Sequence, residues 1–150
     1  GCALTTDLIV GFPGETEAEL EESLAFARQC GFAAMHIFPY SRRPGTPADQ
    51  MPGQLSKAEK EARSARAIAV AESLEQAYLA AQIGTVQEVL WEEPAGDGLY
   101  TGHTPNYTKV YAPGNGLHNQ ICPVTILGLY KDGLLGECND RQTIDIPHNL

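Results

Sequence analysis

Closely spaced cysteines are missing from this 150-residue sequence. No CxxC pair occurs, and the four cysteines stand far apart at Cys2, Cys30, Cys122 and Cys138. Zinc and iron–sulfur sites made within one chain usually depend on such pairs. We therefore predict no metal site in this chain. We interpret the cysteines as reduced, half-buried core residues, a state that favours a cytoplasmic location.

Long apolar runs and an excess of positive charge are missing as well. No apolar run of ~18 residues and no signal peptide is recognisable, so neither membrane spanning nor secretion is predicted. Ten lysines and arginines against 19 aspartates and glutamates give a formal net charge of −9. Neutralisation of phosphates supplies much of the affinity of nucleic-acid binders, so a stand-alone RNA-binding protein would usually be basic. Any RNA contact must therefore use a local basic patch.

A strand, a helix and a second strand follow one another in the first forty residues. Residues 4–10 read as a strand whose apolar centre suits burial on both faces. Thr16 and Glu19 form a capping box that predicts a helix start, and Gly31 predicts the helix end. Residues 35–40 read as the next strand, so the order predicts a right-handed parallel βαβ unit. The side chains expected on the apolar side of the helix are Leu20, Leu24, Phe26 and Ala27.

A long helix and then a different pattern follow. Ser56 and Glu59 form a second capping box, which opens a helix to about residue 82. Beyond it, strand-like segments alternate with turn signals; they are expected at 85–93, 107–111, 121–130 and 134–138. About five strands in so short a stretch predict a small antiparallel β-barrel of the OB-like kind. The fold class is thus α/β plus all-β, in three segments: 1–55, 56–82 and 83–150.

The first segment is too small to stand alone. An isolated βαβ pair has exposed strand edges and uncovered apolar faces, and such a sheet is not independently stable. We therefore expect residues 1–55 to be a piece of a larger parallel sheet or barrel, and the sequence to be truncated. The exposed strand edges also make self-association between copies plausible.

Two unusual loops follow the two predicted strands, GFPGET at 11–16 and YSRRPGT at 40–46. Ligands of parallel α/β folds bind beyond the carboxyl ends of the strands, which is where both loops lie. Gly11 and Gly14 would allow close approach of the backbone to a ligand, and Pro13 would stiffen the turn. The alternative is a well-made strand-to-helix turn without a ligand.

The charges of these loops limit the ligand. Arg42 and Arg43 suit a carboxylate or a phosphate, unless they are simply solvated. A phosphate-binding loop is a poor match, because no GxxxxGK[ST] motif occurs and Glu15 places a negative charge at the turn. A ligand with positive charge or neutral donor groups suits Glu15 better.

A row of basic residues opens the long helix and forms the densest basic patch of the sequence together with Arg42 and Arg43. These residues recur every third position and are Lys57, Lys60, Arg63 and Arg66. They form either an ordinary solvated helix face, partly offset by Glu59 and Glu61, or a surface that contacts the phosphate backbone of RNA.

The barrel segment carries the motif GHTPNYTKV at 102–110. It brings His103, Asn106, Tyr107 and Lys109 together in sequence. An aromatic ring, an amide and a lysine on a small barrel suit base stacking and phosphate contact, and we expect Asn106, Tyr107 and Lys109 to bind RNA. The alternative for Tyr107 is packing in the core.

Five stretches of the chain resemble one known family. They are TTDLIVGFPGETEAELEESLAF, HIFPYSRRPGTPADQMPGQL, IGTVQEVLWEE, GHTPNYTKV and GLLGE. Together they are similar to the C-terminal portion of radical-SAM methylthiotransferases. Within that family they most resemble the MtaB-type tRNA branch, which methylthiolates C2 of N6-threonylcarbamoyladenosine next to the anticodon.

The resemblance implies a fold, cofactors and partners. Residues 1–55 would be the C-terminal βαβ part of a radical-SAM partial TIM-type barrel, and residues 83–150 a TRAM barrel that engages tRNA at the anticodon loop. The full-length enzyme would use S-adenosylmethionine and two [4Fe-4S] clusters. Neither cluster motif occurs here, so the chain alone is expected to bind no cofactor and to be inactive without the missing N-terminal part. The residues expected to line the S-adenosylmethionine pocket are Gly11, Phe12, Pro13, Gly14, Glu15, Tyr40, Ser41, Arg42 and Arg43.

Three other interpretations stay open at this stage. The chain could act as a stand-alone RNA-binding TRAM module. It could belong to the methylthiotransferase branch that modifies isopentenyladenosine in tRNA. It could also be an unrelated α/β small-molecule protein with a β appendage.

Overall fold

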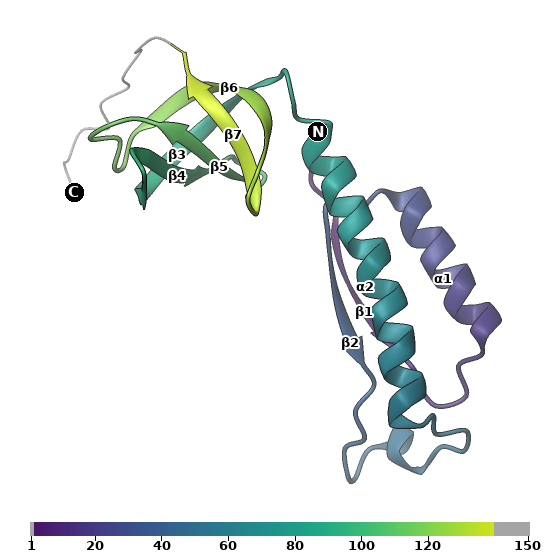
Figure 1. Cartoon of the computed structure of the whole chain (residues 1–150). Helices are drawn as coiled ribbons and strands as arrows, with labels where there is room; N and C mark the ends of the chain where they lie inside the picture. The colour runs from purple at the N-terminus through teal and green to yellow at the C-terminus, as the bar shows by residue number, and fades with distance from the viewer. Residues whose placement is uncertain (1, 140–150) are drawn as a thin grey trace. The chain divides into compact units, whose positions relative to one another are not determined.

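The computed structural model describes residues 2–139, which divide into two compact units at residues 78 and 79. The first unit contains the predicted parallel βαβ arrangement followed by a long helix (Figure 1). Its elements are β1 (Thr5–Val10), α1 (Glu17–Cys30), β2 (Ala34–Pro39), the short 3-10 helix η1 (Pro47–Gln50) and α2 (Lys57–Ala80). No helix between residues 2 and 139 combines the length and apolarity needed to cross a membrane.

Both predicted capping boxes form. Thr16 Oγ1 accepts a hydrogen bond from Glu19 N at 3.2 Å, and Thr16 N donates to Glu19 Oε2 at 2.8 Å. Ser56 and Glu59 exchange the same two bonds at the start of α2. Gly31 ends α1 in the left-handed conformation, with φ of 63°. Local hydrogen bonding therefore sets the ends of these elements, as the sequence predicted.

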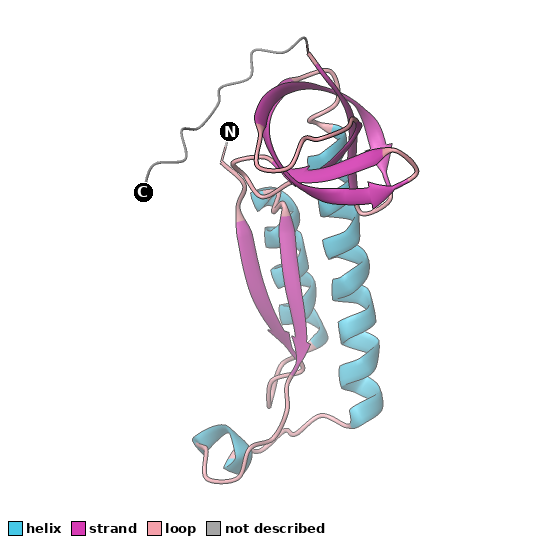
Figure 2. Ribbon diagram, turned by 90° about the vertical axis from the view of Figure 1, so that its left-hand side faces the viewer, coloured by secondary structure: helices cyan, strands magenta, loops and turns pink. Residues whose placement is uncertain are grey.

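Both helices cover the same face of the two-stranded sheet (Figure 2). Val10 of β1, Leu20 and Leu24 of α1, and Ala67 and Val70 of α2 form one buried cluster. The alanine lets α2 approach the strands closely, because it adds no bulk beyond its Cβ. The prediction that Phe26 would join the apolar side of α1 was wrong, since its side chain is 62% exposed.

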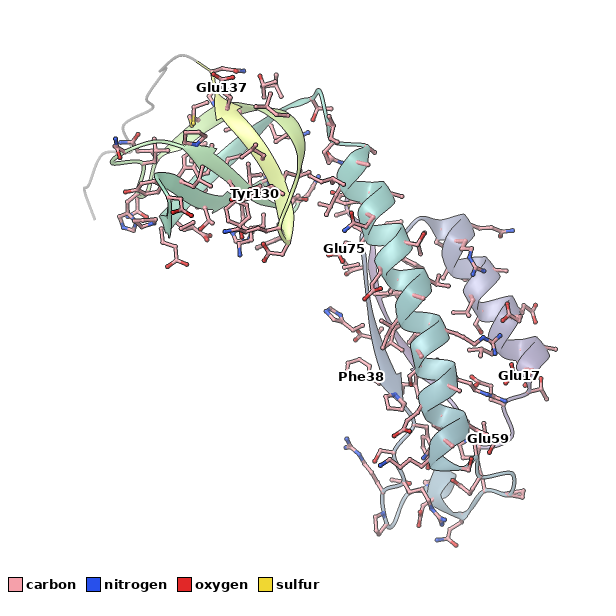
Figure 3. All side chains as sticks on the ribbon, in the orientation of Figure 1. Glu17, Phe38, Glu59, Glu75, Tyr130 and Glu137 are labelled. Carbon is pink, nitrogen blue, oxygen red and sulfur yellow. The ribbon has the colours of Figure 1, made fainter. Side chains whose placement is uncertain are left out.

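The other face of this sheet is open within residues 2–78. Ile9 and Phe38 point away from the helices and are 55% and 51% exposed (Figure 3). Asp7 Oδ1 and His36 Nδ1 lie 3.1 Å apart on the same side. Alternation along the strands thus buries one set of side chains and leaves apolar side chains of the other set uncovered.

The second unit is a closed five-stranded barrel with the strand order β3-β4-β5-β7-β6. Its core contains the fully buried Trp91 together with Val89, Val110 and Leu134. The strands are β3 (Val86–Gly96), β4 (Leu99–His103), β5 (Lys109–Pro113), β6 (Ile121–Tyr130) and β7 (Gly133–Cys138). The predicted class, α/β plus all-β, is therefore confirmed.

Two details of the barrel differ from the prediction. The barrel is mixed, because β5 and β7 pair in parallel while the other pairs are antiparallel. A closed ring with an odd number of strands cannot alternate in direction throughout, so one parallel pair is unavoidable. The strand β4 was not recognised in the sequence, and β5 begins at Lys109 rather than at Tyr107.

Candidate functional site

The two loops singled out in the sequence lie at the same end of the β1–β2 sheet. The strands are parallel and end in register at Val10 and Pro39. Tyr40 N donates to Val10 O at 2.8 Å, and the rings of Phe12 and Tyr40 meet edge to face with centroids 5.2 Å apart. Parallel pairing therefore brings together the Gly11–Glu15 turn and the start of the Tyr40–Arg43 segment.

The Gly11–Glu15 turn is held by several hydrogen bonds. Gly11 N donates to Glu15 Oε1 at 2.9 Å, and Glu15 N donates to Phe12 O at 2.9 Å. Gly14 N donates to Gly53 O at 2.9 Å, which ties the turn to the loop before α2. Gly11 has a φ of 71°, and a Cβ there would lie 2.6 Å from Cγ of Lys60. The turn is rigid, and it requires glycine at this position.

A buried arginine locks this turn onto α2. The Arg63 side chain is 8% exposed, and its Nη1 lies 2.6 Å from Glu15 Oε1 and 2.7 Å from Glu15 O. Its Nε lies 3.1 Å from Glu17 Oε1. Burial alone would lower the pKa of Arg63, but the two carboxylates outweigh it and raise that pKa. The Glu15 carboxylate, expected to face a ligand, is thus engaged within the chain.

The other basic residues of α2 also have partners within the first unit. Lys60 Nζ donates to Tyr40 O at 3.0 Å, and Lys57 lies 3.7 Å from Glu61 across one helical turn. Arg66 binds Glu17 and Glu21 on α1, and its hydrogen bond to Glu17 is the main cause that lowers the pKa of that carboxyl.

These contacts change how the predicted RNA-binding row is read. Arg63 is covered and serves the fold, so its guanidinium does not lie on the surface of this unit. Arg66 is 42% exposed and Lys57 is 89% exposed, so both remain accessible. RNA contact by the α2 row stays a prediction.

The segment after β2 is partly committed as well. Arg42 Nε donates to Asp49 Oδ1 at 2.7 Å, and its Nη2 donates to Asp49 O at 2.8 Å. Asp49 belongs to η1, so this bond fixes the loop between β2 and α2. Ser41 and Arg43 are exposed. A ligand at this end would therefore find Arg43 less constrained than Arg42.

An open groove of about 650 Å³ lies beside the Gly11–Glu15 turn. Four residues of the turn line it together with the face of α1 that carries Glu19, Glu22 and Phe26. The groove is acidic and includes no residue of the Tyr40–Arg43 segment. The two predicted segments are neighbours, but they do not share this groove.

The GHTPNYTKV motif forms a tight turn between β4 and β5. Tyr107 N donates to Thr104 O at 2.9 Å, and Thr104 N donates to Thr108 O at 3.0 Å. Tyr107 has a φ of 59°, which is uncommon for a side chain of this size, and it is 89% exposed. The alternative of core packing for Tyr107 is wrong. The turn instead presents an aromatic ring to solvent.

The surroundings of Tyr107 combine acidic and apolar groups. A depression of about 290 Å³ beside it is lined by Leu90 and Ile121 and by the carboxylates of Glu88 and Glu92. His103 Nδ1 lies 3.0 Å from Glu92 Oε2. The neighbouring Asn106 is half-buried. The site offers a stacking surface and hydrogen-bond acceptors rather than a phosphate pocket.

Lys109 is less free than the sequence suggested. Its Nζ lies 3.0 Å from Asp132 Oδ2, and Tyr111 Oη donates to Asp132 Oδ1 at 2.6 Å. The hydrogen bond from Tyr111 and then that from Lys109 lower the pKa of Asp132, and the bond to Asp132 raises the pKa of Lys109. No signal near Lys109 in the sequence pointed to Asp132, which is 23 residues away.

Metal-binding chemistry finds no support in the part of the chain that the structure describes. Among residues 2–139, no three side chains of histidine, cysteine, aspartate or glutamate come together as a possible metal site.

No known family model matches the sequence. Individual relatives do match over most of its length. Over 118 residues, 76% of this chain and 26% of the relative, it is 39% identical to the threonylcarbamoyladenosine tRNA methylthiotransferase MtaB of Bacillus subtilis. This chain is homologous to part of the tRNA methylthiotransferases. The family resemblance drawn from its motifs is confirmed.

Two further methylthiotransferase relatives belong to the other tRNA branch. The tRNA-2-methylthio-N(6)-dimethylallyladenosine synthase of Sorangium cellulosum is 37% identical over 151 aligned residues, which cover 93% of this chain and 30% of the relative. The synthase of the same name from Oleidesulfovibrio alaskensis is 38% identical over 157 aligned residues, 89% of this chain and 34% of the relative. The chain thus spans about a third or less of the length of these relatives, and the identities do not separate the two branches.

Proposed function

We propose that this chain is the C-terminal portion of a cytoplasmic radical-SAM enzyme that transfers a methylthio group to C2 of a modified adenosine next to the tRNA anticodon. The observation that carries the proposal is the homology to two kinds of tRNA methylthiotransferase over 76% to 93% of the chain. The favoured substrate is N6-threonylcarbamoyladenosine, supported by the HIFPYSRRPGT stretch. The alternative substrate is the isopentenyladenosine, also named dimethylallyladenosine, of the second branch.

The first unit would contribute the last strands of a radical-SAM barrel. The uncovered Ile9 and Phe38 support a larger sheet, because apolar side chains at this density are usually covered. Gly11–Glu15 and Tyr40–Arg43 lie where ligands of such folds bind, at the carboxyl ends of parallel strands. We propose that these two segments line part of the S-adenosylmethionine pocket.

The cofactors of such an enzyme would be S-adenosylmethionine and two [4Fe-4S] clusters. The turn fits the first, since a Cβ at Gly14 would meet no atom within 4 Å and the backbone there can be approached closely. Residues 2–139 do not fit the clusters, because they contain no group of three candidate ligands. When bound, these groups supply radical and sulfur chemistry. The residues of this chain would position the cofactor and exclude water.

The proposal is tested by the tRNA nucleosides of cells that lack the gene. We expect methylthiolated threonylcarbamoyladenosine to disappear, as measured by liquid chromatography with mass spectrometry, and to return when the complete gene is supplied. A gene encoding residues 1–150 alone should not restore it. Loss of the methylthio group from dimethylallyladenosine would assign the other branch, and unchanged nucleosides of both kinds would contradict the proposal.

A second role, RNA binding by the barrel, is favoured by the exposed ring of Tyr107. We propose that Tyr107, with Asn106 and Lys109, contacts the anticodon loop, and that Lys57 and Arg66 add phosphate contacts. Base stacking on an aromatic ring is worth about 1–3 kcal/mol. This role would hold even if the chain acts as a stand-alone TRAM module. Self-association through open strand edges stays a separate prediction.

Replacing Tyr107 by alanine should weaken binding of a labelled tRNA anticodon stem–loop about tenfold. Because the side chain is 89% exposed, its removal should leave the thermal unfolding of the barrel unchanged. Fluorescence anisotropy at several salt concentrations measures the affinity and its salt dependence.

The matched control is Phe26→Ala, which removes a ring that is 62% exposed on α1. We expect Phe26→Ala to bind as the parent chain does. Equal affinities of the Tyr107 variant and the parent would exclude Tyr107 from the RNA contact.

A further inference from the structure

Two cysteines far apart in the sequence meet in the barrel. Cys122 Sγ on β6 and Cys138 Sγ on β7 are 3.2 Å apart. Cys138 pairs with Val124 in the antiparallel β6–β7 ladder, which makes Cys122 its diagonal neighbour on the same strand face. The pairing continues one residue further, where Asn139 N donates to Pro123 O at 2.9 Å. The strand register therefore holds the two sulfurs together.

The sulfur pair lies beside an accessible cavity. Both cysteines line a cavity of about 370 Å³ bordered by the loop that carries Asn115 and Leu117. Both side chains are half-buried rather than enclosed. A small reagent can therefore reach them while the barrel stays folded.

The surroundings distinguish the two thiols. Trp91 Nε1 lies 2.9 Å from Cys122 Sγ. An indole N–H only donates hydrogen bonds, so the Cys122 sulfur accepts, and a thiolate accepts more strongly than a thiol. Burial and the neighbouring Cys122 raise the pKa of Cys138 to about 12. Cys122 is therefore the nucleophile of the pair, and Cys138 stays protonated until it reacts.

We propose that Cys122 and Cys138 form a reversible disulfide that links β6 to β7 at this end of the barrel. The oxidant is a low-molecular-weight disulfide such as oxidised glutathione. The Cys122 thiolate attacks one sulfur of that disulfide and releases one glutathione thiolate. Cys138 then loses its proton to water or to that thiolate and attacks Cys122 Sγ, which releases the second glutathione. In sum, two protein thiols are oxidised and one glutathione disulfide is reduced.

The geometry requires only a small movement. A disulfide has an S–S length of about 2.05 Å, so the sulfurs must approach by roughly 1.2 Å. Diagonal neighbours in an antiparallel pair are about 7–8 Å apart at Cα, slightly more than most disulfides span. Cys138 is the last residue of β7, and a shift at a strand end disturbs fewer ladder bonds than one in the middle.

The test uses the full chain with Cys2→Ser and Cys30→Ser, which leaves only the pair. The protein is equilibrated with glutathione buffers of increasing oxidising strength and then alkylated. We expect a mass lower by two hydrogens and one cross-linked peptide pair on digestion without reductant. Trp91 is the single tryptophan, and its fluorescence should fall on oxidation and recover with dithiothreitol. Free thiols at every ratio, or two bound glutathiones, would overturn the proposal.

Single variants test the order of the two steps. In Cys138→Ser, Cys122 should accumulate as a mixed disulfide with glutathione. In Cys122→Ser, Cys138 should react at least tenfold more slowly. Equal rates in the two variants would show independent thiols and contradict the pair. If a variant fails to fold, the mass and the peptide map of the double serine chain still decide.

Discussion

Replacing Arg63 by methionine is expected to lower the free energy of unfolding of the first unit by about 3 kcal/mol, because breaking a buried ion pair leaves a charge without its partner. The Glu15 side chain is 16% exposed, and it would keep only the Gly11 N–H as a hydrogen-bond donor among the contacts described here. Arg63 also binds the main-chain oxygen of Glu15, so the substitution loosens the turn itself.

The two units allow a clean measurement of this effect. Helix content measured by circular dichroism during urea unfolding follows the first unit, which contains α1 and most of α2. Trp91 fluorescence follows the barrel and serves as an internal reference. The matched control is Arg66→Met, whose side chain is 42% exposed and whose ion pairs are worth about 0–1 kcal/mol. Equal losses in the two variants would contradict the assignment of Arg63 as the residue that locks the turn.

A double variant separates loss of the arginine from burial of the unpaired carboxylate. Glu15→Gln combined with Arg63→Met removes both charges. If the unpaired carboxylate is the main cost, the double variant should be more stable than Arg63→Met alone, since the two residues are in direct contact and their effects are not additive.

Replacing Gly102 by alanine is expected to destabilise the barrel by about 3 kcal/mol, at the upper end of typical overpacking costs. A Cβ at Gly102 would lie 2.3 Å from Leu90 O and 2.8 Å from Val89 Cγ1. The first of these contacts is to the backbone of the neighbouring strand, so no side-chain rotation relieves it. The β3 and β4 strands must separate instead.

Gly128 provides the matched control for this substitution. It lies in β6 of the same barrel, and a Cβ there would meet nothing within 4 Å. Gly128→Ala should therefore be neutral or slightly stabilising, because alanine restricts the unfolded chain. Trp91 pairs with Gly102 across β3 and β4, so its fluorescence reports the unfolding directly. A Gly102→Ala barrel as stable as the Gly128→Ala barrel would show that the strands yield without cost.

Much of the first unit was predictable because its signals are local. The capping boxes at Thr16 and Ser56 join residues three apart, and the left-handed Gly31 is specified by its own backbone. A short strand–helix–strand connection then dictates parallel pairing. Parallel pairing alone predicts that the turn after β1 and the loop after β2 meet at one end of the sheet, as they do.

The roles of the charged residues were not predictable in the same way. Arg63 looked like one member of a solvated or RNA-binding row, yet it binds Glu15 from 48 residues away. Helical spacing shows which side chains share a face, but it does not say which face turns toward another element. Lys109 was likewise expected at a phosphate, while the closing of the barrel supplies Asp132 as its partner.

The sequence by itself determined the family, the βαβ unit, the helix ends and the presence of a small barrel, because these depend on neighbouring residues and on motifs that can be read in order. The tertiary structure alone decided that β5 and β7 pair in parallel, that Tyr107 faces solvent, and that Cys122 meets Cys138. Those features arise when strands distant in sequence are brought into register. A register is set by the packing of the whole barrel core, which no single stretch of the chain encodes.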